Sequence, residues 1–267
     1  MIDTITHTLI AGALTAFAIM IIAWIVCVRI HNAAWVDVVW AYSIGVLSLG
    51  YFLILGMPIG PQLLGFVLIA IWSLRLGTHL LIRIATEPED GRYQEIKKQW
   101  GGERSPKLFG FFMIQAAAAF FFSIPPLLAM HSAKSAWSAN DWIAVVIAII
   151  AISGETLADR QLRRFKANPK NQGKVCKSGL WRYSRHPNYF FEWIFWLAFP
   201  SITWGSSAFF PALAAPLIML FLILKMTGIP PTEAQAIRKR GESYRQYQRE
   251  TSAFFPWFPK SETTTQS

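Results

Sequence analysis

Long apolar runs separated by polar segments dominate this sequence of 267 residues and leave few folds open to it. A helix needs about 20 apolar residues to cross about 30 Å of hydrocarbon, and inside a bilayer every backbone N–H and C=O must be bonded within the protein. We therefore expect seven membrane-spanning helices. They correspond to Thr8–Val28, Val36–Gly56, Pro61–Ile82, Leu108–Met130, Trp142–Leu157, Tyr189–Trp204 and Ser207–Leu224.

The composition supports this interpretation. Apolar residues make up 54% of the chain and charged residues only 15%, whereas a soluble domain carries about 25% charged residues. So few charges cannot cover a surface that faces water, and so many apolar residues exclude intrinsic disorder. We expect an all-α, polytopic membrane protein with a single membrane domain over residues 1–267.

The basic residues set the expected orientation. Six Lys and Arg lie in Arg83–Lys107, nine in Ala158–Asn188 and seven in the tail from Lys225, whereas the loops that should face the other side hold only Lys134. By the positive-inside rule, the N-terminus lies outside and the C-terminus in the cytoplasm. The same rule, with contact to anionic membrane lipids, explains the basic excess, so we expect no nucleic-acid partner.

Five ionisable side chains fall within the expected spans, where such groups are costly and default to functional roles. All five lie in the cytoplasmic third of their spans. A long arginine reaches the headgroups easily, but short carboxylates do not. We therefore expect a shared polar cavity that opens to the cytoplasm. The five are Asp37, Arg75, His79, Glu155 and Glu192.

Two segments border this cavity, and the first is Glu155–Lys166. At helical spacing, Glu155, Asp159 and Lys166 fall roughly on one side, with Arg163 close by. Carboxylates and cations on one face can hold the hydroxyls and phosphates of a nucleotide. A basic helix end at the membrane surface is the alternative explanation.

The second segment, Ser178–Glu192, mixes amide, carboxylate, cationic and aromatic groups just before an expected span. Pro187 is typical of a helix start. Asn188 and Glu192 are then four residues apart on one helix face. An amide beside a carboxylate suits recognition of a carboxamide such as nicotinamide.

This second segment resembles the C-terminal signature of the steroid 5-alpha-reductase family of membrane reductases, and most closely its bacterial branch. The resemblance predicts a multi-pass protein of the bacterial inner membrane with seven helices. The matching residues are Gly179-Leu180-Trp181, Arg185-His186-Pro187-Asn188-Tyr189, Glu192, the upstream Asp159 with Phe165-Lys166, and the tail Gly241–Tyr247 with Phe255-Pro256.

The resemblance implies an NADPH-dependent reduction of a carbon–carbon double bond conjugated to a carbonyl. The lipophilic substrate would enter from the bilayer among residues 1–107, and residues 108–267 would form the cofactor site. Asp37 is the expected acid that polarises the carbonyl. The family pattern assigns the cofactor to Asp159, Lys166, Trp181, Asn188, Glu192 and Tyr247. We add Arg163 and His186 from the same segments, and Arg75, which belongs to a weaker N-terminal resemblance.

Two positions depart from the family pattern. Trp72 stands where the steroid reductases carry a tyrosine that assists the carbonyl, three residues before Arg75. Tyr42 and His79 are the candidate replacements for this tyrosine. Phe191 replaces a glycine that usually precedes the glutamate, so the local cofactor geometry is expected to differ.

Two other classes of function stay open. Isoprenylcysteine carboxyl methyltransferases share the Arg-His-Pro signature and bind S-adenosylmethionine in the same place; Asn188 paired with Glu192 favours the reductases. A non-catalytic lipid-binding or scaffold protein would leave Asp37 and Glu192 without a role. The histidines have no metal-ligand spacing and the two cysteines form no CxxC motif, so we expect no metal site.

Overall fold

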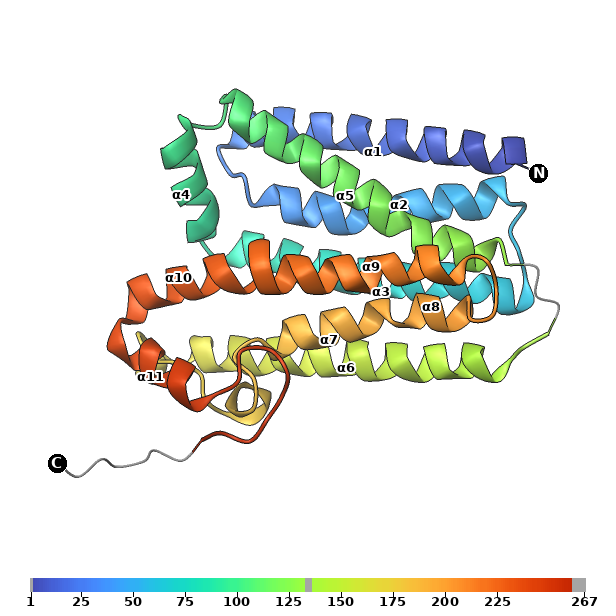
Figure 1. Cartoon of the computed structure of the whole chain (residues 1–267). Coiled ribbons are helices and arrows are strands. Elements are labelled where there is room, and N and C mark those ends of the chain that lie inside the picture. Colours follow the sequence, from blue (N-terminus) through green and yellow to red (C-terminus); the bar gives the residue numbers. More distant parts are fainter. Residues whose placement is uncertain (1, 133–135, 261–267) are drawn as a thin grey trace. The chain divides into compact units, whose positions relative to one another are not determined.

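The computed structural model describes residues 2–132 and 136–260, and all regular elements in that part are helices (Figure 1). Lys134, the cation expected on the outer side, lies outside the described residues. The long helices are α1 (Ile2–Ile30), α2 (Trp35–Ile54), α3 (Leu63–Thr86), α5 (Pro106–Met130) and α6 (Ala139–Ala167). The shorter ones are α4 (Gly91–Trp100), α7 (Pro187–Trp196), α8 (Ala198–Ile202), α9 (Phe209–Phe221), α10 (Ile229–Arg240) and α11 (Glu242–Glu250).

Six helical segments of the described ranges are long and apolar enough to cross a bilayer, as expected of a multi-pass membrane protein. They are Thr4–Ile30, Trp35–Ile54, Gly60–Thr86, Pro106–Met130, Ala139–Ala167 and Phe209–Arg240. The last combines α9, a π-helical stretch over Leu222–Met226, and α10.

The expected span Tyr189–Trp204 consists instead of two short helices, α7 and α8. Pro200 explains the break, because it has no N–H to donate to the carbonyl of Trp196, where α7 ends. The count of seven spans and the orientation of the termini therefore stay predictions.

The described chain divides into two compact units. Unit 1 contains residues 2–132, 136–143 and 199–215, and unit 2 contains residues 144–198 and 216–260. In unit 1, the helices α1, α2, α3 and α5 pack along one another, and α4 crosses one end of this bundle (Figure 1). The division of function at residue 107 stays a prediction.

Helices α2 and α3 pack closely within unit 1 because glycine removes the side chain at the contact. A Cβ on Gly77 would lie 2.6 Å from the ring of Tyr42. Nearby, Trp72 is fully buried and packs edge-on against Trp40, with ring centroids 5.9 Å apart. Trp72, at the position where the resemblance implies a tyrosine, therefore belongs to the core of unit 1.

In unit 2, α6 and α7 pack against each other at a second glycine. The ring of Phe191 occupies the space that a Cβ on Gly154 would need. The departure from the family pattern at Phe191 is thus accommodated by the missing side chain on the facing helix. Pro187 is the first residue of α7, which confirms the helix start predicted from the sequence.

We predict that Gly77→Ala destabilises the protein by about 1–3 kcal/mol, because the added methyl group overpacks the contact with Tyr42. Thermal unfolding in detergent measures this. The matched control is Gly50→Ala on α2, since a Cβ there has nothing within 4 Å. Equal unfolding temperatures for the two variants would contradict the packing described here.

Candidate functional site

Four polar residues on α6 and α7 form what we call the α6–α7 polar cluster: Glu155, Asp159, Asn188 and Glu192. The side-chain amide of Asn188 donates to Oδ1 of Asp159 over 3.3 Å. Glu192 accepts a hydrogen bond of 2.8 Å from the indole of Trp196, one turn further along α7. The two segments that the sequence indicated for nucleotide binding are thus joined within unit 2.

The register of the two helices follows from two contacts. Gly154 faces Phe191, and Asp159 faces Asn188, so α6 and α7 run antiparallel. Because side chains four residues apart share a helix face, this register puts Glu155 at the level of Glu192. The three carboxylate side chains of the cluster are each at most 9% exposed.

Cations continue α6 beyond the cluster. Arg163 and Lys166 are exposed, and they follow Asp159 by four and seven residues, which is roughly 6 and 10 Å along a helix. Along α6, buried carboxylates, with the Asn188 amide of α7 bonded to one of them, are therefore followed by exposed positive charge. A ligand with a neutral polar end and an anionic end complements this order.

Trp181 and Tyr247, both predicted to contact the cofactor, hold the loop before α7. The Trp181 indole donates to the carbonyl of Ala158 on α6 over 2.9 Å. The Tyr247 hydroxyl donates to the carbonyls of Trp181 and Ser184, the latter over 3.3 Å. Burial raises the pKa of Tyr247, so its phenol remains a hydrogen-bond donor. Their contact with a cofactor stays a prediction.

Glu233 of α10 is a central residue of unit 2 that sequence reasoning missed. Its carboxylate accepts from Arg185 over 2.6 Å and lies 3.2 Å from Nε2 of His186. His186, predicted as a cofactor residue, is buried with a side chain only 4% exposed. In the sequence, Glu233 is marked only as an acidic residue near the start of a helix, just after Pro230-Pro231. Its partners His186 and Arg185 lie 47 and 48 residues earlier in the chain, so spacing could not reveal them.

In unit 1, the predicted catalytic residue Asp37 lies at the start of α2. It accepts a hydrogen bond of 2.5 Å from the hydroxyl of Tyr93 on α4 and forms an ion pair of 3.7 Å with Arg92. Tyr93 is buried, and burial together with the Asp37 charge raises its pKa well above the usual value. The Tyr93 phenol therefore keeps its proton, which it donates in the hydrogen bond to Asp37.

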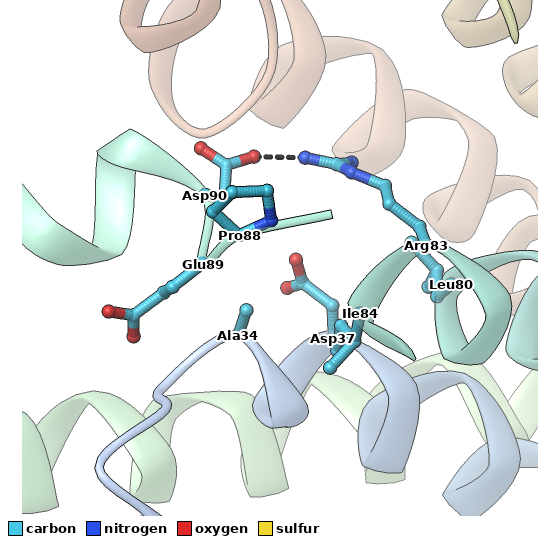
Figure 2. Close-up of a pocket in the computed structure, with 8 residues that line it drawn as sticks. All are labelled: Ala34, Asp37, Leu80, Arg83, Ile84, Pro88, Glu89 and Asp90. Carbon is cyan, nitrogen blue, oxygen red and sulfur yellow. Dashed lines mark hydrogen bonds and ion pairs between the residues drawn. The ribbon is translucent and has the colours of Figure 1, made fainter. Parts of the chain in front are cut away.

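Asp37 lines a small, open pocket. Figure 2 shows its carboxylate pointing toward the loop that carries Pro88 and Asp90, and Arg83 reaching across to Asp90. The lining residues are Ala34, Asp37, Leu80, Arg83, Ile84, Pro88, Glu89 and Asp90. We call this the Asp37 pocket.

Charges around the pocket are compensated in pairs. Asp90 accepts from the backbone and side chain of Arg92 as the N-cap of α4, and it also pairs with Arg83. Burial acts to raise the pKa of the Asp90 carboxyl. The opposing effects of Arg92 and then Arg83 are larger together, so the pKa falls to about 2. Glu89 accepts from Lys97 over 2.7 Å and from the backbone of Ala33 over 2.7 Å.

The other predicted residues of unit 1 do not line this pocket. The Tyr42 hydroxyl lies 3.0 Å from that of Thr78 on α3. His79 and Arg75 are half-buried on α3. Of the predicted catalytic residues, Asp37 lines this pocket, and Tyr93 is the hydroxyl beside it, which the sequence did not indicate.

Among the residues that the structure describes, no three His, Cys, Asp or Glu side chains gather in a way that could hold a metal ion.

With this geometry in view, sequence comparison identifies the family. The family described as "Protein of unknown function (DUF1295)" matches residues 23–251. The chain belongs to this family. It is also similar to "Uncharacterized protein C594.04c" of Schizosaccharomyces pombe (strain 972), with 27% identity over 289 residues that cover 94% of this chain and 80% of the relative. No solved structure matches the chain significantly. Neither description names a reaction, so the chemistry must be argued from the residues.

We predict that Asp90→Asn lowers the stability at pH 7 by about 2 kcal/mol, because the native carboxylate is favoured by its depressed pKa. Asparagine is an equally good N-cap, so the change isolates the charge. This stability is complete above the unfolded pKa of 3.8 and is lost as the pH falls toward about 2.

Denaturant unfolding between about pH 5 and pH 2 measures this effect, and the variant should show a flatter dependence on pH than the wild type. Glu95→Gln is the control, since the Glu95 carboxylate on α4 accepts a hydrogen bond from a neutral partner, Gln99. Parallel pH profiles for Asp90→Asn and the wild type would contradict the role of the arginines.

Proposed function

We propose that this protein is an NADPH-dependent membrane reductase that reduces a carbon–carbon double bond conjugated to a carbonyl in a lipophilic substrate. The observation that carries the proposal is the hydrogen bond between Asn188 and Asp159, on two apolar helices, with Glu192 buried one turn further on. Such groups are costly in a membrane unless they serve a ligand or each other. The resemblance to the steroid 5-alpha-reductases supports the same assignment.

The residues of unit 2 fit a nicotinamide dinucleotide by their chemistry. A carboxamide both donates and accepts, and Asn188 with the Glu192 carboxylate offers matching groups. Exposed Arg163 and Lys166 suit the phosphates, since cations bind phosphate oxygens through charge-assisted hydrogen bonds. When bound, NADPH supplies the hydride for the reduction.

The chain's own residues then bind, orient and exclude water. Asp159 accepts one N–H of the Asn188 amide, which fixes the amide plane and leaves its second N–H and its carbonyl oxygen for a ligand. The indole of Trp196 donates to Glu192 and orients its carboxylate. Burial keeps this polar cluster away from water. Its hydrogen bonds are stronger in the protein interior than they would be in water, because the local dielectric constant is lower.

For the substrate we propose that Asp37 and Tyr93 act together on the carbonyl. Polarising a carbonyl needs a hydrogen-bond donor aimed at its oxygen. The phenol of Tyr93 donates to Asp37 over 2.5 Å, and we propose that it exchanges this acceptor for the carbonyl oxygen of the substrate, a role that the core residue Trp72 cannot fill. This pair replaces Tyr42 and His79 as our candidate for the missing family tyrosine.

A methyltransferase that uses S-adenosylmethionine is the second candidate, favoured by the buried carboxylates of the cluster, which suit a sulfonium cation. That cofactor carries no phosphate, however, so it would make no use of Arg163 and Lys166. The reductase therefore accounts for more of the site.

We predict that NADPH and NADP+ raise the unfolding temperature of the purified protein in detergent, because a ligand that binds only the folded state stabilises it. Asn188→Ala should abolish this shift. Asn140→Ala is the control, since Asn140 lies 19 residues before Asp159 on α6, roughly 28 Å along the helix. Stabilisation by S-adenosylmethionine alone would overturn the reductase assignment in favour of the methyltransferase.

We further predict that Asp37→Asn retains the thermal shift with NADP+ but reduces NADPH oxidation with lipophilic enones by about 100-fold or more, the size of effect expected when a group of the acid–base machinery is lost. A 3-oxo-4-ene steroid and a long-chain enone are suitable probes. Unchanged turnover in the variant would remove Asp37 from the reaction.

A further inference from the structure

One carboxylate joins the C-terminal helices of unit 2 to the loop that precedes α7. Oε1 of Glu233 accepts from Nε of Arg185 over 2.6 Å, from the Tyr244 hydroxyl over 3.4 Å, and lies 3.2 Å from Nε2 of His186. Its Oε2 accepts from the Gln248 amide over 2.6 Å. Glu233 thus binds two consecutive loop residues and two residues of α11.

Arg185 shows that this contact also fixes the loop backbone. Its guanidinium donates to the carbonyl of Gln248 over 3.0 Å and to that of Thr251, and its backbone N–H donates to Ser252 over 2.9 Å. The side chain is only 10% exposed, so its charge depends on Glu233 for compensation.

His186 transmits the contact to α7, because it is the N-cap residue of that helix. Its ring lies parallel to that of Tyr189, with centroids 5.3 Å apart and an interplanar angle of 6°. The Tyr189 hydroxyl in turn lies 3.2 Å from that of Thr232, the neighbour of Glu233 on α10. Two adjacent residues of α10 therefore hold the first turn of α7.

We propose that Glu233 is a positioning residue that sets the orientation of His186 and, through the first turn of α7, the place of Asn188 opposite Asp159. A neutral imidazole that donates from Nε2 to this carboxylate has a single tautomer, with Nδ1 as an acceptor. Asn188 follows two residues later and makes the contact of the polar cluster. The proposal rests on the proposed cofactor site and adds the residue that assembles it.

The test measures the affinity of the full-length protein in detergent for NADP+, with S-adenosylmethionine as a parallel ligand, by the concentration dependence of the unfolding temperature. Glu233→Gln should weaken the ligand that the wild type binds by about tenfold or more. Glu250→Gln is the matched control: Glu250 pairs with Lys177 over 2.8 Å, so it also ties the C-terminal segment to the loop, but at a different residue.

A second variant separates positioning from stability. In Glu233→Gln with Gln248→Glu, the amide and the carboxylate exchange places across their 2.6 Å hydrogen bond. The pair and the local charge are kept, so the unfolding temperature without ligand should recover. The carboxylate now starts from α11, so the contact with His186 is lost and the affinity should stay low.

The outcomes distinguish the two proposals. Weak binding in both Glu233 variants, with normal binding in Glu250→Gln, supports the positioning role. Wild-type affinity in Glu233→Gln, or affinity that recovers together with stability in the exchanged pair, overturns it and leaves the proposed function intact. If the wild-type protein binds S-adenosylmethionine instead of NADP+, the proposed reductase function is overturned. The affinities of the same variants for S-adenosylmethionine then decide the role of Glu233.

Discussion

Apolar surroundings force the polar groups of this chain to bond with one another, and the arrangement of both units follows from that constraint. Lipid offers no partner to a carboxylate or an amide. On α6 and α7 the response is the bond between Asp159 and Asn188 and the bond between Trp196 and Glu192. These contacts fix side chains that a flexible surface would leave mobile, which is the condition for binding a ligand with defined geometry.

The charged ends of the helices follow the same rule with ion pairs. In unit 1, Asp90 lies between Arg83 and Arg92, and the Asp37 pocket is formed beside it. In unit 2, Glu233 compensates Arg185 and orders the start of α7. In each unit, one carboxylate at a helix end thus accepts hydrogen bonds from several donors. In each case the neighbouring residues include some with a proposed role in the reaction.

The features that depend on local sequence could be predicted. Apolar runs predicted the long helices and Pro187 predicted the start of α7. Helical spacing singled out Asp159 and Asn188, which the structure brings into contact. The break between α7 and α8 was not predicted, because the apolar run continues without interruption through Pro200. Sequence spacing also gave no sign that Phe191 would fit against Gly154.

Long-range partners could not be predicted from spacing. Tyr93 meets Asp37 across 56 residues, and Glu233 meets Arg185 across 48. Each is an ordinary polar residue in a polar segment, and only the packing of helices distinguishes it from its neighbours. The two residues that most change our view of the chemistry, Tyr93 and Glu233, are therefore those that required the structure.

The central claim is that the α6–α7 polar cluster binds a nicotinamide cofactor. An experimental structure of the purified protein with NADP+ tests it most directly. Our account predicts the carboxamide of the nicotinamide within hydrogen-bonding distance of Asn188 and Glu192, and the phosphates beside Arg163 or Lys166. A dinucleotide bound elsewhere, with Asn188 and Glu192 contacting only protein, would contradict it.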